Sequence, residues 1–277
     1  MNFNSTLYPE FQWSFSTLGC PELTLDEICE LARSFGLSFT ELRAIQGRVD
    51  LPPLFTEQFG SPTSLSSHLN DQQVGVSCLD TSLKLVGNSI EDRLSFLKFL
   101  PWADGIGTQF LRVFDGGAVD AGMNDIAYGM ACDTIEWWLE EREKSGWKAD
   151  IAIETHDCLV QKESHQRLAV KYPELKMIWD THHTWKKGSD CIETSWAQLG
   201  SNTCSVHIKD SISEPSARHP FTYVNLGDGE FPLTTTLDLL KQNQFEGYVC
   251  IEWERMWHPY LSDIKEAFTR ARELNWF

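Results

Sequence analysis

The sequence predicts an α/β fold, a single-domain (β/α)8 TIM barrel spanning residues 1–277. Eight apolar strand candidates follow one another along the chain, and helical stretches lie between most of them. Strands that alternate with helices form parallel sheets, and 277 residues suit one large barrel domain. No glycine-rich nucleotide-binding turn follows the first strand, and no linker divides the chain. A closed barrel is therefore favoured over an open nucleotide-binding sheet.

The predicted strands are short runs of apolar residues. They centre near Phe15, Leu42, Val76, Val113, Ile153, Ile178, Val206 and Ile251. The first predicted helix, 25–35, begins at a capping box formed by Thr24 and Glu27 and ends at Gly36. Further helices are predicted from residue 88 or 89 and over 126–144, 162–171, 233–241 and 262–274. Prolines 52, 53 and 62 interrupt the stretch after the second strand, so we expect mostly loop there, with only a short helix.

Composition and charge narrow the classes of partner. A chain with a net charge of −17 lacks the basic surface that nucleic acids or anionic membranes require, so we expect no nucleic acid and no membrane partner. The hydrophobic fraction of 42% is sufficient for a full core. Eight cysteines show no C-x-x-C pair, and the first ten residues do not resemble a signal peptide. We therefore expect reduced cysteines and a cytoplasmic protein.

Four late strands each end in a residue that can bind a metal. In chain order these residues are Glu154, Asp180, His207 and Glu252. A buried polar group at a strand end is costly unless it meets a partner, and the strand ends of a barrel converge. The sequence therefore predicts that three carboxylates and one imidazole bind one divalent ion. This oxygen-rich set suits Mn, Mg or Co better than a structural zinc, although zinc is also possible.

The alternation of side chains along these strands supports the same site. Residues two apart share a face of a strand, so Glu154 groups with Ala152, His207 with Ser205, and Glu252 with Cys250. These inner neighbours are small and leave room beneath the predicted site. The residues between them are bulky and apolar, as packing against surrounding helices requires.

The chain resembles the xylose isomerase-like TIM-barrel superfamily of sugar and sugar phosphate isomerases and epimerases. The resemblance spans nearly the whole barrel and is most specific in the segments 154–156, 180–183, 207–210, 226–229 and 251–254. In this family a Glu, an Asp, a His and a Glu from successive late strands hold the metal. The resemblance implies that Glu154, Asp180, His207 and Glu252 do so here, and that His183, rather than His182, contacts the substrate.

The resemblance to ketose 3-epimerases also implies a mechanism. The metal binds the carbonyl and neighbouring hydroxyl of a small sugar, sugar phosphate or keto-polyol and stabilises a cis-enediolate. Glu154 and Glu252 are then the two acid/base catalysts, one on each side of the reacting carbon. These epimerases fix substrate with an arginine shortly after the metal histidine, where this chain has Ser213. The loop 211–223 is therefore expected to define a different substrate.

Other polar residues have two interpretations. Lys209, Arg112 and His156 are predicted substrate-binding residues, and internal ion pairing is an equal alternative for Lys209 and Arg112. Glu41 and Arg43 are expected to pair with neighbours across the barrel mouth. We expect His165, His219 and His258 to lie at the surface or in loops, without special chemistry.

Two alternatives to an isomerase or epimerase remain open. A lyase of the inosose dehydratase type would use the same ligands and expel a hydroxyl group. A catalytically silent barrel would bind carbohydrate or a protein partner without turnover. The sequence determines neither the sugar, nor its phosphorylation, nor the native metal. A homodimer also stays open, because members of this group often pair through barrel helices and loops.

Overall fold

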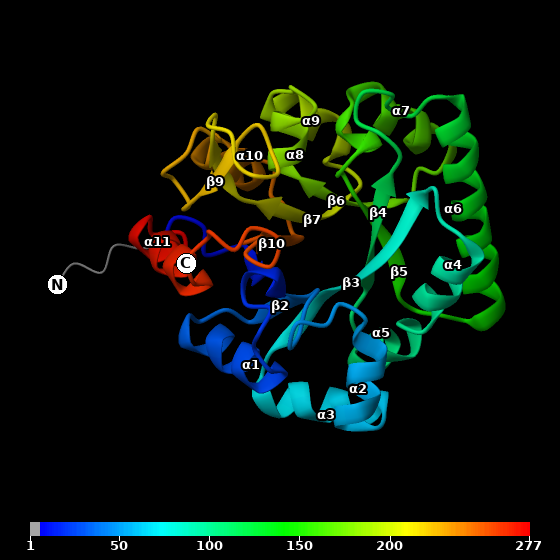
Figure 1. The fold of residues 1–277 in the computed structure, drawn as a ribbon, viewed down its shortest axis with the longest axis horizontal. Coiled ribbons are helices and arrows are strands. Elements are labelled where there is room, and N and C mark those ends of the chain that lie inside the picture. The colour runs from blue at the N-terminus through cyan, green and yellow to red at the C-terminus, as the bar shows by residue number, and fades with distance from the viewer. Residues whose placement is uncertain (1–5) are drawn as a thin grey trace.

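Eight parallel strands form a barrel surrounded by helices, which confirms the predicted fold (Figure 1). The structure is a computed structural model that describes residues 6–277. The barrel strands are β1 (Gln12–Phe15), β2 (Phe39–Leu42), β3 (Gly75–Val86), β4 (Phe110–Gly116), β5 (Asp150–Glu154), β6 (Lys176–Asp180), β7 (Thr203–Ile208) and β10 (Tyr248–Ile251). They lie in the order β1-β10-β7-β6-β5-β4-β3-β2, and a parallel bridge between Ser16 and Glu41 joins the two ends. A hairpin of β8 (Asp210–Ile212) and β9 (Thr222–Val224) follows β7.

The helices connect these strands and cover the outside of the barrel (Figure 1). They are α1 (Leu25–Ser34), α2 (Leu51–Phe59), α3 (Pro62–Gln72), α4 (Ile90–Leu97), α5 (Leu100–Ile106), α6 (Asp125–Ser145), α7 (Lys162–Lys171), α8 (Thr181–Lys186), α9 (Ile192–Leu199), α10 (Leu233–Gln242) and α11 (Ile264–Glu273), with two 3-10 turns, η1 (Thr17–Gly19) and η2 (Cys158–Val160). The capping box of Thr24 and Glu27 begins α1 as predicted. None of the described helices is both long enough and apolar enough to cross a membrane.

The prediction of mostly loop after β2 was wrong. Two helices, α2 and α3, occupy this stretch; Pro52 and Pro53 are the second and third residues of α2, and Pro62 is the first residue of α3. The first turn of a helix has no internal partner for its N–H groups, so proline begins a helix there instead of breaking it. Ser61 adds a cap to α3, because its hydroxyl accepts a hydrogen bond from the Ser64 N–H at 3.2 Å.

Helices α5, α8 and α9 and the β8–β9 hairpin were not predicted. Helix α8 begins directly after β6, and Asp180 at the end of that strand caps it by accepting the His183 N–H at 2.8 Å. The strand therefore turns into a helix without an intervening loop. A helix of six residues that follows a strand directly is too short to show a helical period in the apolar pattern.

The two faces of the barrel strands pack differently. The bulky residues between the site positions, including Ile153, Val206 and Ile251, belong to the main core with the helices. Inside the barrel, a small separate apolar cluster includes Cys78, Ala152 and Ile178. Polar side chains occupy the space above this cluster, at the carboxyl ends of the strands.

Candidate metal centre and its surroundings

The four predicted metal ligands meet inside the barrel mouth. Glu154 and Asp180 end β5 and β6, His207 lies near the end of β7, and Glu252 follows β10. The paired register of β6, β7 and β10 sets Asp180 beside His207 and Cys250 beside His207. One ligand atom from each of the four side chains lies within 4.8 Å of the others, and all four residues are buried.

His207 lies between two of the carboxylates. Its Nδ1 is 3.5 Å from Glu154 Oε1 and 3.4 Å from Glu252 Oε2, yet it makes no hydrogen bond of normal geometry. Its Nε2 is 3.0 Å from Glu41 Oε2, and the Glu41 side chain is fully buried at the end of β2. A proton on Nε2 donated to Glu41 leaves the Nδ1 lone pair facing the cluster. This is the arrangement by which a carboxylate orients a metal-binding histidine.

The pKa values of the carboxylates differ because their partners differ. Burial opposes ionisation of Glu154, but the Arg112 guanidinium and His207 together outweigh it and lower the Glu154 pKa to about 2. Burial raises the pKa of Asp180 to about 6, against the opposing effect of Lys209. Burial also opposes ionisation of Glu252, and Lys209 with His207 nevertheless holds its pKa well below the usual range. The cluster thus concentrates negative charge in a buried space.

The donor set fits a divalent cation. Three buried carboxylates and an imidazole nitrogen without a hydrogen bond are expensive to hold together unless a positive charge compensates them. Oxygen-rich sets of this kind bind Mn or Mg, and zinc also accepts carboxylate and imidazole ligands. The ligand types therefore agree with a divalent ion without selecting one metal.

Lys209 supplies positive charge to the same cluster. Its Nζ lies 2.7 Å from Asp180 Oδ2 and 2.6 Å from Glu254 Oε1, and it also contacts Glu252. Although burial opposes a charged amine, these carboxylates raise the Lys209 pKa well above its usual value. Lys209 is therefore held as a buried ammonium at the edge of the candidate metal centre.

Arg112 is also engaged within the protein. Its guanidinium lies 2.8 Å from Glu154 and 3.4 Å from Asp80, and it stacks 3.7 Å from the centre of the Phe114 ring. Nearby, the Arg43 guanidinium contacts the backbone carbonyl of Asp80. Glu41 thus has a partner across the barrel in His207, as the sequence suggests, whereas the partners of Arg43 lie on the neighbouring strand β3. For Arg112, ion pairing is the interaction that the structure contains, and direct substrate contact stays a prediction.

The two histidines predicted to contact substrate lie together beside the cluster. The ring of His183 is buried, its Nδ1 is 2.8 Å from Asp180 Oδ2, and its centre is 4.7 Å from the centre of the His156 ring. His156 is partly exposed. His182 instead points its Nε2 at the Ser211 hydroxyl, 2.7 Å away. Of the two adjacent histidines, His183 is therefore the one whose ring contacts a predicted ligand.

The predicted role of the remaining histidines was partly wrong. His165 lies on α7 as a buried residue, and neither of its ring nitrogens makes a hydrogen bond. Burial lowers its pKa to about 3, which keeps the ring neutral. His258 lies in a loop but is also buried, with Nε2 3.7 Å from Glu254. Their sequence neighbours gave no sign of this, because both burials arise from packing between distant segments.

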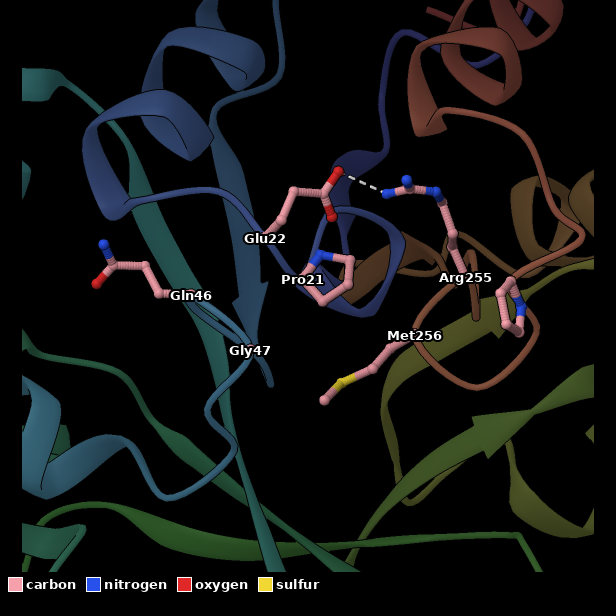
Figure 2. A pocket seen from close by; sticks show the side chains of 7 residues that line it. Pro21, Glu22, Gln46, Gly47, Arg255 and Met256 are labelled. Atoms are coloured by element: carbon pink, nitrogen blue, oxygen red, sulfur yellow. Dashed lines mark hydrogen bonds and ion pairs between the residues drawn. The ribbon is translucent and has the colours of Figure 1, made fainter.

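A cavity of about 580 Å³ opens at the same end of the barrel (Figure 2). It was not predicted. Its walls come from the loops after β1, β2 and β10, and the lining residues are Pro21, Glu22, Gln46, Gly47, Arg255, Met256 and Pro259. The wall segment that contains Arg255 and Met256 begins only a few residues after Glu252. No single stretch of sequence could have revealed a cavity assembled from three distant loops.

The loop before α10 is organised by one carboxylate. Asp210 accepts the N–H groups of Gly227 at 2.9 Å, Gly229 at 3.0 Å and Phe231 at 3.0 Å, and also that of Ser211 at 2.8 Å. The Leu226–Gly229 segment, singled out by the family resemblance, is therefore wrapped around the Asp210 side chain.

The barrel and its acidic cluster define a class: a parallel (β/α)8 protein with a candidate cation site at the carboxyl ends of its strands. Within this class, the chain belongs to the xylose isomerase-like TIM barrel family, whose model matches residues 29–275. None of the curated protein sequences matches the chain.

Solved structures show the same fold at low sequence identity. The probable 3-DHS dehydratase AsbF of Bacillus anthracis is 16% identical, with a TM-score of 0.76 over 95% of this chain and 98% of that one. The IOLI protein with a bound zinc atom is 16% identical, with a TM-score of 0.72 over 94% and 95%. A D-tagatose 3-epimerase-like protein is 14% identical, with a TM-score of 0.67 over 95% and 94%.

Proposed function

We propose that this chain is a divalent-metal-dependent isomerase or epimerase of a small sugar or keto-polyol. The observation that carries the proposal is the convergence of Glu154, Asp180, His207 and Glu252, whose ligand atoms lie within 4.8 Å of one another in a buried space. The family and its epimerase-like neighbour support the same class of reaction.

The chain's own groups are arranged for proton transfer. A bound divalent ion would polarise a substrate carbonyl and its neighbouring hydroxyl, which makes the carbon between them more acidic. Glu154 and Glu252 reach the cluster from β5 and β10, which are separated in the barrel by β6 and β7. Arg112 and Lys209 favour the ionised forms of these carboxylates, so each can accept a proton. One glutamate removes the proton and the other returns it from the opposite side.

The neighbouring side chains would position the substrate. His156 and His183 form a pair of rings beside Asp180, and we assign them to hydroxyl groups of the substrate. Lys209 has three carboxylate neighbours and Arg112 has two, so both act first by holding the catalytic carboxylates. Any contact of Lys209 or Arg112 with substrate comes in addition to this role.

Two glutamine substitutions test the two-base scheme. Glu154→Gln and Glu252→Gln should each lower solvent-deuterium exchange into a ketose by at least a hundredfold, while substantial ligand binding remains. Metal content is measured in both variants, because each change also removes a charged ligand. The exposed Glu266→Gln is the control and should retain wild-type exchange. Full activity in either site variant would exclude the scheme.

A lyase reaction at the same site is the second candidate. One of the solved neighbours is a probable 3-DHS dehydratase, and a dehydratase needs the same acidified carbon. The products distinguish the two reactions. Deuterium in an isomeric sugar supports isomerisation or epimerisation, whereas loss of water from the substrate supports the lyase. Protein without stoichiometric metal and without turnover would instead indicate a silent barrel.

We propose Mn, Mg or Co as the native ion, and zinc is the competing choice because the IOLI neighbour holds it. Metal analysis of the purified protein decides among them. The proposed partner is a small-molecule sugar, and the oligomeric state, including a homodimer, is to be measured in solution.

A further inference from the structure

Two carboxylates and a thiol meet inside the barrel, outside the ligand set of the candidate metal centre. Glu41 lies on β2, and Cys78 and Asp80 lie on β3. One ligand atom from each of the three side chains lies within 4.8 Å of the others. In the same order, the three residues are 0%, 1% and 1% exposed. We name this group the β2–β3 cluster.

The pairing of the two strands brings these side chains together. Cys78 and Asp80 are two residues apart on β3, so their side chains share one face of the strand. A register shift between Thr40 and Glu41 pairs Glu41 with Cys78, whereas regular pairing would have placed it opposite Ser77. Irregularities of this kind redirect side chains and are frequent beside active sites. The shift therefore puts the Glu41 carboxylate on the face that carries the thiol.

Each carboxylate of the β2–β3 cluster keeps one oxygen without a partner. Glu41 Oε2 lies 3.0 Å from His207 Nε2, and Asp80 Oδ2 lies 3.4 Å from the Arg112 guanidinium. The second oxygens, Glu41 Oε1 and Asp80 Oδ1, are buried and make no hydrogen bond. A buried carboxylate oxygen without a partner costs free energy. Both oxygens therefore lack a donor or a cation.

The neighbouring cations do not compensate the two carboxylates. Arg112 is shared between Asp80 and Glu154. The Arg43 guanidinium contacts a backbone carbonyl and a hydroxyl group instead of a carboxylate. An ion at the candidate metal centre is bound by other carboxylates. Glu41 and Asp80 thus carry negative charge that the described residues leave partly uncompensated.

The donor types of the β2–β3 cluster favour zinc. Zinc binds carboxylate oxygen and cysteine sulfur at about 2.0–2.3 Å, and three protein ligands with one open position are common. Mn and Mg prefer oxygen ligands alone. Cys250 also lies within 4.8 Å of Glu41 and His207. However, one nitrogen of His207 faces Glu41 and the other faces the candidate metal centre, so that second grouping has no free imidazole.

From the unpartnered oxygens, the uncompensated charge and the donor types, we propose that Glu41, Cys78 and Asp80 bind a zinc ion at a site separate from the candidate metal centre. The carboxylates bind through their free oxygens, and Cys78 binds as a thiolate. Zinc takes the place of the thiol proton, which is released to solvent. The site adds a second metal of a different kind and does not depend on the proposed reaction.

Cobalt(II) reports on the thiolate ligand directly. It occupies zinc sites, and a cobalt–thiolate bond gives a charge-transfer absorption that carboxylate and imidazole ligands do not give. The reduced, metal-free full chain should develop this absorption at one thiolate per chain, and added zinc should abolish it. Cys78→Ser should remove the absorption. Asp80→Asn should weaken cobalt binding at this site at least tenfold.

Two control variants should keep the thiolate absorption. Cys204→Ser changes another buried cysteine of the small inner apolar cluster, whose thiol has its own hydrogen bond to the Met177 carbonyl. Asp180→Asn removes a ligand of the candidate metal centre alone. Zinc content after dialysis gives a second measurement, and it should be one equivalent lower in Cys78→Ser than in the wild type. Circular dichroism checks that each variant is folded.

Three results would overturn the zinc site. The first is a wild-type chain that binds cobalt without a thiolate absorption. The second is an absorption that survives Cys78→Ser, including one that Cys250→Ser removes instead. The third is wild-type cobalt affinity in Asp80→Asn. None of these measurements requires turnover, so a failure of the zinc site and a failure of the proposed function are distinguishable.

Discussion

Glu41 and His207 show how one contact joins residues that are far apart in the sequence. The Glu41 carboxylate lies at the end of β2, 3.0 Å from the imidazole at the end of β7, and both side chains are buried. The interaction fixes the direction in which the histidine presents its other nitrogen. From the sequence, Glu41 is only one of many acidic strand-end residues, and its role depends on barrel closure.

The Glu41 contact predicts an effect on metal affinity. Glu41→Leu should weaken Mn binding about tenfold to a hundredfold, because the His207 ring loses the acceptor that orients it. Glu41→Gln keeps an acceptor oxygen and should lose less. Calorimetric titration of the metal-free variants measures both affinities, and circular dichroism checks the fold. Wild-type affinity in the leucine variant would contradict the orienting role.

Lys209 predicts an effect on the stability of the metal-free protein. Lys209→Met removes the only ammonium in contact with Asp180, Glu252 and Glu254 among the described residues. The free energy of unfolding should fall by about 3–5 kcal/mol, the usual cost of leaving buried charge unpaired. Added Mn should restore more stability to this variant than to the wild type.

Urea unfolding with and without Mn measures both effects. The matched control is Lys186→Met, whose ammonium lies 3.6 Å from the exposed Glu230. That change should cost no more than about 1 kcal/mol. Equal stability of the Lys209 variant and the wild type would show that the three carboxylates are already protonated or solvated.

At the scale of elements, the effect of a proline on a helix depends on the position that the proline occupies in it. Pro52, Pro53 and Pro62 suggest interruption when they are considered only as helix breakers. In the structure they occupy the first turns of α2 and α3, where no internal N–H bond is lost. Position within the helix, rather than the presence of proline, therefore decides whether the helix forms.

The loop before α10 gives a prediction at the same scale. Asp210→Asn replaces one acceptor oxygen with an amide group that cannot accept the N–H groups of Gly227 and Gly229. We expect a loss of about 1–3 kcal/mol in unfolding free energy, because buried donors lose their acceptor. Amide exchange at both glycines should become faster. Asp228→Asn, at an exposed neighbour, should leave these rates unchanged.

At the scale of the whole molecule, the packing of α7 against the barrel makes stability sensitive to acid. Burial lowers the pKa of His165 to about 3 in the folded protein, whereas an unfolded histidine titrates near 6.5. Between these values the unfolded chain takes up a proton that the folded chain does not. The contribution of His165 to the free energy of unfolding is therefore fully present above about pH 6.5, and it is lost as the pH decreases toward 3.

His165→Leu should remove this component of the acid sensitivity. Between pH 7.5 and pH 5 the wild type should lose about 2 kcal/mol more unfolding free energy than the variant. Urea titrations at both pH values measure the difference, and carboxylates affect both proteins alike. Parallel losses in wild type and variant would show that His165 does not titrate with unfolding.

Much of the barrel was predictable because its signals are local. Apolar runs with bulky outward residues such as Ile153 and Val206 mark strands, and the box of Thr24 and Glu27 marks the beginning of α1. The four candidate ligands were predicted by the ends of such runs. Their convergence follows once parallel strands close into a barrel, because all strand ends then face one opening.

The sequence by itself determined the strand order along the chain, the family and the chemical types at the strand ends. The tertiary structure decided the contact of Glu41 with His207, the placement of Lys209 among three carboxylates, the burial of His165 and the cavity beside Arg255. The physical reason is the distance along the sequence over which each kind of signal acts. Strand and cap signals arise from neighbouring residues, whereas these contacts exist only after distant segments have packed together.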